Sequence, residues 1–216
     1  MPLSSQQKKG VFTTLAVIVA IISLFLGLFF HKLFSPRVLS KTELMANGAI
    51  VFDKPRIIKP FELIDQNAQS FNLDQLTGKW TLMFFGFTSC PDICPATMAQ
   101  LSQLYKKLDN DIAEQTQVIL VSVDPVRDTP ELLKTYVSHF QEGFVGLTGE
   151  FLNVKRLSDN LNVAFNKVTL DGDDYTIDHS GNIVLINPYG HYHGFFKPPF
   201  ELARLKLTYQ SVVSSF

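Results

Sequence analysis

Thr88-Ser89-Cys90-Pro91-Asp92-Ile93-Cys94-Pro95 holds the only two cysteines of this 216-residue chain. The nearly uninterrupted apolar run before it, residues 80–87, is typical of a buried central strand. After it, apolar residues recur at helical spacing over residues 96–108. The cysteines are therefore predicted to lie at a strand-to-helix turn, at or within the first turn of the helix, where they would share one face.

The predicted position of the cysteines bears on their chemistry. The start of a helix presents free N–H groups and the positive end of its dipole, and both stabilise a thiolate over a thiol. Two cysteines are too few for a disulfide-stapled scaffold in a chain of 216 residues. Cys90 and Cys94 are therefore predicted to be a redox pair or metal ligands rather than ordinary buried thiols.

The N-terminal part of the chain predicts a membrane anchor. Residues 1–10 are polar, with Lys8 and Lys9 and no acid, and residues 11–30 carry no charge. Such a run can cross a bilayer core of ~30 Å as a helix, and no small-x-small cleavage site follows it. We expect a cytoplasmic or matrix-side N-terminus over 1–10 and an uncleaved transmembrane anchor over 11–31, in preference to a buried soluble helix.

The remaining chain divides into a predicted linker over 32–54 and one domain over 55–216, a size that suits a single core. The net charge of −1 argues against a basic nucleic-acid-binding surface. Strands over 80–87 and 117–123, joined by the helix, predict a right-handed βαβ unit with parallel pairing. The other expected elements are a hairpin over 61–73, a helix to 140 that starts with a capping box of Asp128 and Glu131, a strand over 144–147, a helix over 151–161, a strand over 163–170, an acidic turn over 171–174, a strand within 175–188, an extended segment over 193–196, and a closing helix over 199–212.

This order of elements resembles a thioredoxin-like α/β fold with an N-terminal hairpin. Three motifs occur along it: Cys-Pro-x-x-Cys-Pro at 90–95, Asp-Pro-x-Arg-Asp-Thr-Pro at 124–130, and Asp-His-Ser at 178–180. Together they are similar to the Sco/SenC family of copper-binding proteins, which help to assemble cytochrome c oxidase. The resemblance covers about residues 55–210, in addition to the N-terminal anchor.

The resemblance implies a copper site made of Cys90, Cys94 and His179. The chemistry of these side chains agrees, because thiolates are soft ligands that suit Cu(I) and an imidazole suits either copper state. A structural zinc site usually has four protein ligands, so zinc is disfavoured.

Four charged residues of the first two motifs are candidates for supporting the ligands or contacting a partner: Asp92, Asp124, Arg127 and Asp128. Asp124 could cap a helix or place charge near the metal, and Asp92 could be a solvated side chain. For Arg127 and Asp128, a surface ion pair and a helix cap are favoured over direct chemistry.

His191 and His193 form a His-x-His pair that would share one face of an extended strand. Such a pair could bind a second metal, although solvated side chains near a turn are the favoured interpretation.

The favoured function is a copper chaperone, which needs no turnover chemistry. It would deliver copper to the copper-bearing subunit of cytochrome c oxidase, or keep the thiols of that subunit reduced. The alternatives are a thiol–disulfide oxidoreductase with a redox-active disulfide between Cys90 and Cys94, and a copper or redox sensor. Three residues separate the cysteines, where thioredoxin-like redox enzymes typically have two, and no proline occurs between Pro130 and Pro188, where such enzymes carry a cis-proline. Both features favour the metal site.

Further expected partners are other periplasmic copper chaperones or thioredoxin-like reductants. Basic residues flank the anchor on both sides, so the charge pattern leaves its orientation open. A copper or thiol task belongs in an oxidising compartment. Without an Arg- and Ser-rich leader, we expect a bacterial inner membrane with the C-terminal domain in the periplasm, in preference to a mitochondrial inner membrane facing the intermembrane space.

Overall fold

The computed structural model describes residues 5–34, 37–170 and 174–216. It divides into two units, Met1–Arg37 and Val38–Phe216. The first unit contains helix α1 (Ser5–Phe34). Its stretch Phe12–Phe30 has a mean hydropathy of 2.6 and is long and apolar enough to cross a membrane. The large apolar side chains described in this stretch are exposed.

The second unit is built on an eight-stranded sheet with the strand order β1-β10-β9-β4-β5-β6-β2-β3. Strands β4, β5 and β6 run parallel, and the other neighbours in the sheet pair antiparallel. A separate two-stranded hairpin is formed by β7 and β8. The strands are β1 (Ala49–Ile57), β2 (Leu63–Asp65), β3 (Ser70–Phe71), β4 (Trp80–Gly86), β5 (Thr116–Ser122), β6 (Val145–Thr148), β7 (Phe165–Thr169), β8 (Tyr175–His179), β9 (Ile183–Ile186) and β10 (His191–Phe196).

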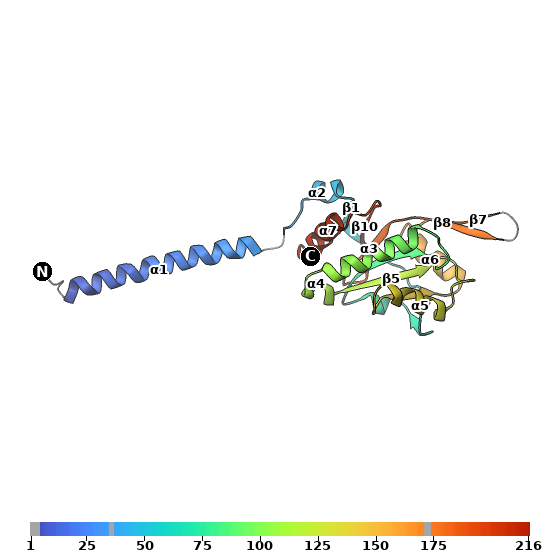
Figure 1. Cartoon of the computed structure of the whole chain (residues 1–216), viewed down its shortest axis with the longest axis horizontal. Coiled ribbons are helices and arrows are strands. Elements are labelled where there is room, and N and C mark those ends of the chain that lie inside the picture. The colour runs from blue at the N-terminus through green and yellow to red at the C-terminus, as the bar shows by residue number, and fades with distance from the viewer. Residues whose placement is uncertain (1–4, 35–36, 171–173) are drawn as a thin grey trace. The chain divides into compact units, whose positions relative to one another are not determined.

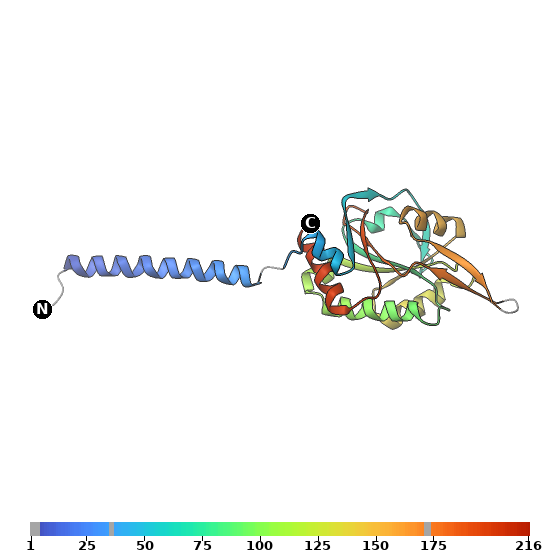
Figure 2. The same ribbon diagram turned by 90° about the horizontal axis from the view of Figure 1, so that it is seen from above.

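Helices cover both faces of this sheet. Three of them, α3, α5 and α7, lie on one face, and α6 lies on the other (Figure 2). The crossovers β4–α3–β5 and β5–α5–β6 join adjacent parallel strands, so right-handed connections place α3 and α5 on the same side. The helices are α2 (Lys41–Ala46), η1 (Leu73–Leu76), α3 (Ile93–Lys107), α4 (Asn110–Glu114), α5 (Pro130–Phe140), α6 (Phe151–Asn160) and α7 (Leu202–Ser214).

The core lies around β4, whose seven residues are all buried. This strand is flanked by β5 and β9 in the sheet, which explains its almost continuous apolar sequence. The whole buried cluster falls within residues 39–212, so Val38–Phe216 has a hydrophobic core of its own. From the carboxyl end of β4 the chain passes through residues 87–92 into α3, which Figure 1 shows in green.

These features confirm the predicted thioredoxin-like fold, including the N-terminal hairpin β2–β3. The predicted linker over 32–54 is wrong, because α2 and β1 occupy most of it. A capping box of Ser40 and Glu43 starts α2, and β1 pairs with β10 from Ala49 opposite Phe196 onward. A strand whose partner lies so far along the chain carries little local signal. Of the predicted acidic turn 171–174, residues 171–173 lie outside the described residues.

The predicted capping box of Asp128 and Glu131 is also wrong. Thr129 caps α5 by accepting a hydrogen bond from the Leu132 amide at 3.3 Å, and Pro130 occupies the first turn. Asp128 is buried one residue earlier and is therefore available for another role.

Candidate metal centre

The two cysteines lie on either side of the start of α3. Cys94 is the second residue of the helix, whereas Cys90 lies in the turn before it and Asp92 is the N-cap residue. They therefore do not share a helical face, contrary to the prediction. The turn nevertheless brings their sulfurs together, and the Cys90, Cys94 and His179 ligand atoms all lie within 4.8 Å of one another.

A glycine makes room for the Cys94 sulfur. Gly86 ends β4, and a Cβ atom at this position would lie 2.8 Å from Cys94 Sγ. That distance is shorter than a van der Waals contact, so any side chain here displaces the sulfur. Gly86 was not among the residues predicted for the site. The available signal was a glycine at the end of a buried strand, which often marks a close approach.

His179 reaches the cysteines from the hairpin, where it is the last residue of β8. Its Nε2 lies 3.3 Å from Cys94 Sγ, and its Nδ1 lies 3.2 Å from the Ser180 carbonyl oxygen. Because a carbonyl can only accept a hydrogen bond, Nδ1 carries the proton and Nε2 presents its lone pair to the sulfur. The rings of Phe84 and Phe87 stand edge-on to the imidazole at 5.7 and 5.9 Å.

Burial controls the protonation of these ligands. It raises the pKa of the Cys94 thiol well above its usual value, and a hydrogen bond with Cys90 adds to the effect. Burial also lowers the pKa of His179, against the opposing influence of the Ser180 carbonyl and Asp178. The predicted stabilisation of a thiolate by the helix start is therefore outweighed for Cys94. In the metal-free protein at neutral pH, an incoming metal must displace the thiol proton and meets a neutral imidazole.

Asp124 and Arg127 anchor the strand that carries His179. Asp124 is buried, forms an ion pair with Arg127 Nε, and accepts a hydrogen bond from the Tyr175 hydroxyl at 2.8 Å. Arg127 Nη1 donates to the Tyr175 carbonyl at 3.1 Å, and its guanidinium lies 3.9 Å from the centre of the Tyr175 ring. Arg127 thus pairs with Asp124, not with Asp128 as predicted, and the pair fastens the first residue of β8 to the loop after β5.

Asp128 fastens the cysteine segment from the other side. Its carboxylate accepts hydrogen bonds from the Thr88 amide at 3.1 Å, the Thr88 hydroxyl at 2.6 Å and the Ser122 hydroxyl at 2.6 Å. Burial raises the pKa of Asp128, although these hydrogen bonds act in the opposite direction. The carboxylate therefore joins the end of β5 to the residue two positions before Cys90. Asp92, in contrast, is exposed and its side chain makes no capping hydrogen bond.

His191 and His193 lie on β10, away from this cluster. His193 is buried rather than solvated, with its ring 5.1 Å from that of Trp80 and 5.6 Å from that of Phe216. Within residues 5–34, 37–170 and 174–216, Cys90, Cys94 and His179 form the one group of three or more His, Cys, Asp or Glu ligands that could share an ion. The less favoured alternative, a second metal on the His-x-His pair, gains no support from these residues.

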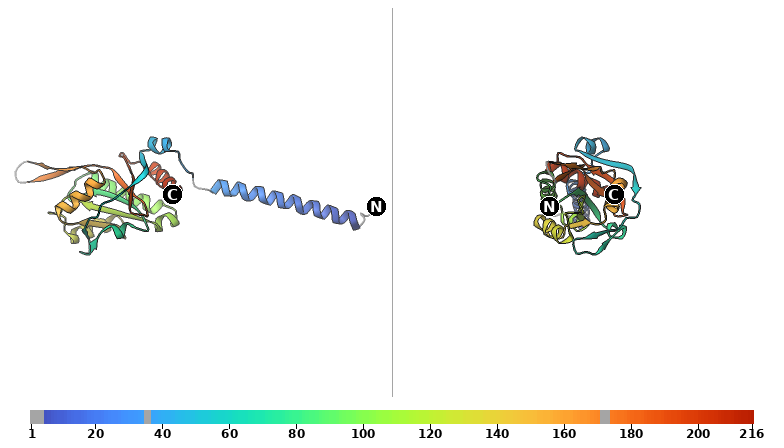
Figure 3. Two further views of the ribbon diagram at one scale, coloured as in Figure 1. Left: turned by 180° about the vertical axis from the view of Figure 1, so that it is seen from behind. Right: turned by 90° about the vertical axis from the view of Figure 1, so that its right-hand side faces the viewer.

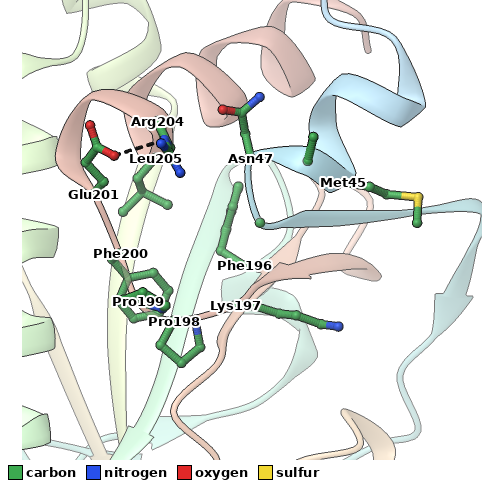
Figure 4. Close-up of a pocket in the computed structure, with 12 residues that line it drawn as sticks. Met45, Asn47, Phe196, Lys197, Pro198, Pro199, Phe200, Glu201, Arg204 and Leu205 are labelled. Carbon is green, nitrogen blue, oxygen red and sulfur yellow. Dashed lines mark ion pairs between the residues drawn. The ribbon is translucent and has the colours of Figure 1, made fainter.

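Two cavities of the domain differ in whether cysteine and histidine side chains line them. One of about 340 Å³ borders the ligand cluster and is lined by Phe87, residues 90–93 and residues 176–179. Another, of about 310 Å³, lies between the α2–β1 turn and the loop from β10 to α7 (Figure 4). Of its three charged residues, Glu201 and Arg204 pair with each other at 2.9 Å and Lys197 is the third, and its lining contains neither cysteine nor histidine.

The ligand cluster fits a soft metal ion. Ligand atoms of a four-coordinate ion with bonds of about 2.0–2.3 Å lie roughly 3.3–3.8 Å apart, so the observed spacing needs only small side-chain movements. Two sulfurs with one imidazole suit copper. Fold and site together define a thioredoxin-like protein with a dithiol–imidazole centre.

Comparisons with known proteins agree with this class. The SCO1/SenC family model matches residues 52–212, and the chain belongs to this family. A Stutzerimonas stutzeri relative, whose provisional name is copper-binding protein, is 42% identical over 159 residues, which are 74% of this chain and 78% of that protein. The SCO2-like protein of Rickettsia felis is 39% identical over 178 residues, covering 81% of this chain and 86% of the relative.

Solved structures give the same result. The crystal structure of Arabidopsis thaliana ScoI with copper bound has a TM-score of 0.70 and 30% identity, and the match covers 74% of this chain and 99% of that one. Yeast Sco1 with copper bound has a TM-score of 0.68 and 31% identity, over 75% of this chain and 91% of the other.

Proposed function

We propose that this protein is a membrane-anchored copper chaperone that holds copper through Cys90, Cys94 and His179. The observation that carries the proposal is the convergence of two sulfurs and one imidazole nitrogen within 4.8 Å. Copper-bound relatives with the same fold support the choice of metal. Copper is cargo in this function, and the residues hold it by ligation without turnover chemistry.

The proposed recipient is the copper-bearing subunit of cytochrome c oxidase. Membership of the SCO1/SenC family supports this choice, because the family is one of oxidase assembly. Transfer requires only ligand exchange, in which ligands of the recipient replace Cys90, Cys94 and His179 one after another. The cavity of about 340 Å³ borders Cys90 and His179 on one side of the site. It gives a recipient access to these ligands.

A Cu(I) titration tests the metal site. The domain Val38–Phe216 is reduced under anaerobic conditions and titrated against a competing chelator, together with Cys90→Ser, Cys94→Ser and His179→Ala. We expect one tight equivalent for the parent and weaker binding in all three variants. His191→Ala is the matched control, because it removes an imidazole outside the cluster. No tight copper in the parent would contradict the proposal, and loss in the cysteine variants alone would remove His179 from the site.

The anchor and its orientation form a separate part of the proposal. Helix α1 spans the inner membrane of a bacterium, with residues 1–10 in the cytoplasm and Val38–Phe216 in the periplasm. Alkaline phosphatase fused after Phe216 should then be active, since this enzyme needs disulfides that form outside the cytoplasm. An inactive phosphatase fusion, together with a fluorescent green fluorescent protein fusion at the same point, would reverse the orientation.

The neighbouring thiols also support a second candidate, a thiol–disulfide oxidoreductase. Both cysteines are free and lie close enough for a disulfide to form after a small movement. Because burial raises the pKa of the Cys94 thiol, the less buried Cys90 would be the attacking group in this function. Rapid reduction of a disulfide substrate by the metal-free domain, unaffected by His179→Ala, would favour the oxidoreductase over the chaperone.

A further inference from the structure

Strand β8, which carries His179, has a free edge. It pairs with β7 alone in a two-stranded sheet, and this hairpin extends out from the body of the domain (Figures 1 and 3). In the part of the chain that the structure describes, no second strand pairs with β8. A strand edge of this kind presents unpaired N–H and C=O groups that can accept another strand.

The register shows which backbone groups of β8 point to that edge. The amide of Ser180 donates to the Ala164 carbonyl, and the amide of Leu170 donates to the Asp174 carbonyl. Antiparallel pairs exchange hydrogen bonds at every second residue, so the even-numbered residues of β8 bond to β7. The N–H and C=O groups of Ile177 and His179 therefore point away from β7. The Tyr175 carbonyl confirms this alternation, because it bonds to Arg127 on the outer side.

The free edge borders the cavity beside the metal ligands. Residues 176–179 line the cavity of about 340 Å³ from the hairpin, and residues 90–93 line it from the turn before α3. Ile93 is 41% exposed at this position, which provides an apolar contact next to Cys94. The cavity thus combines unpaired backbone groups, apolar surface and copper ligands, the features that an added strand uses for affinity and specificity.

The charge around the cavity indicates what kind of strand fits. Asp92 and Asp178 line it, and both are exposed. Among the described residues no ion pair involves either carboxylate, and no lysine or arginine lines the cavity. A segment with lysine or arginine beside its copper ligands is therefore favoured over an acidic one.

We propose that the copper-exchanging segment of the partner binds as an extended strand along the free edge of β8, at Ile177 and His179, with basic residues facing Asp92 and Asp178. This inference rests on the proposed copper function and specifies how the partner is recognised. Residues directly opposite each other on paired strands project to the same face. A cysteine or histidine of the partner opposite His179 therefore projects toward Cys90 and Cys94, where it can take over the copper ion. The step is ligand exchange, so no electron changes hands.

The protein variants for the test exploit the alternation. Ile177→Pro removes an N–H group of the free edge while leaving the hydrogen bonds to β7 in place. Lys167→Pro is the matched control, because Lys167 lies directly opposite Ile177 and its N–H points to the far edge of β7. Each domain is loaded with one Cu(I), and the rate of transfer is measured to a small chelator and to a blocked peptide. The peptide has a Cys-Val-Cys centre flanked by threonine and lysine.

We expect the ratio of the peptide rate to the chelator rate to fall at least tenfold in Ile177→Pro and to stay at the parent value in Lys167→Pro. The ratio corrects for any general loosening of the site, since Ile177 is itself buried. Equal ratios in all three proteins would overturn the strand-addition proposal. A parent domain that fails to load Cu(I) would instead overturn the proposed function.

Two N-methylated peptides give an independent test. Each carries methyl groups on every second amide, in opposite phases, so that one phase blocks the hydrogen bonds to β8 and the other leaves them free. We expect one of the two to receive copper at least tenfold more slowly than the other. Replacing lysine by glutamate in the parent peptide should also slow transfer. Equal rates for the two methylated peptides would contradict strand addition, whatever the effect of charge.

Discussion

Two histidines of this domain have similar surroundings but different roles. Both His179 and His193 have a pKa lowered mainly by burial, and both stand edge-on to two aromatic rings. The free nitrogen of His179 faces a sulfur at 3.3 Å, whereas His193 Nδ1 faces the side-chain amide of Asn187 at 3.3 Å. Burial alone therefore does not make a histidine a metal ligand. The group that faces its free ring nitrogen distinguishes the two.

The same contrast extends to one buried polar residue that supports each cluster. Asp128 holds the Thr88 amide and two hydroxyl groups, and so fixes the segment that carries the cysteines. Asn187 accepts hydrogen bonds from the Tyr189 and His191 amides at 3.1 and 3.0 Å, and so fixes the turn into β10. One network supports a ligand cluster, and the other supports an aromatic cluster.

The largest expected effect separates the two histidines directly. His179→Ala should weaken Cu(I) binding at least on the order of 100-fold, since even the loss of a hydrogen bond to a ligand costs roughly 10–100-fold. His193→Ala should leave copper affinity unchanged and lower the free energy of unfolding by about 2 kcal/mol through lost packing. Chelator competition and urea denaturation measure the two quantities. Equal losses of copper affinity would remove the distinction.

The next effect compares the two polar residues. Asp128→Ala and Asn187→Ala should each lower the free energy of unfolding by about 2 kcal/mol, because each leaves hydrogen-bond donors without their acceptor. Only Asp128→Ala should also weaken Cu(I) binding, since it releases the segment before Cys90. Denaturation of the metal-free domains and chelator competition give both numbers. Weaker copper binding in Asn187→Ala would show that general destabilisation, not local support, sets the affinity.

A pair of glycine variants tests the space around the sulfur. Gly86→Ala should cost about 1–2 kcal/mol of stability by overpacking and should also weaken copper binding, because the new methyl group displaces Cys94 Sγ. Gly146→Ala is the matched control, since its Cβ would lie 3.1 Å from Leu133 and away from the ligands. Copper titration should separate the two. Similar copper affinities in both variants would argue against a role for Gly86 at the site.

The smallest effect concerns pH. Because burial places the pKa of His193 below its ordinary value, the unfolded chain binds the proton more readily. The neutral His193 imidazole therefore contributes to the free energy of unfolding at neutral pH. This contribution is lost as the pH falls below about 6.5 toward the pKa of His193 in the folded state. We expect metal-free His193→Gln to lose less unfolding free energy than the parent between pH 7 and 5. Urea denaturation at several pH values measures this, and parallel curves would contradict it.

The sequence was sufficient to predict the central features of the site. The cysteine motif, the preceding apolar strand and the following helical pattern are local signals, and the family motifs added His179. The supporting contacts were not predictable in the same way. Asp128 and Glu131 have the spacing of a helix cap, yet the carboxylate of Asp128 turns inward because the ends of β4 and β5 offer three donors there. Such donors meet only after the strands have paired.

Local sequence by itself determined the apolar helix at the N-terminus, the βαβ unit and the positions of the two thiols, because periodicity and turn chemistry act over a few residues. Tertiary structure alone decided the rest. It paired β1 with β10, placed Arg127 against Asp124 and β8, and buried Cys94 deeply enough to raise the pKa of its thiol. These outcomes depend on distances between residues that are remote in sequence, and on the loss of water around them, which no local pattern encodes.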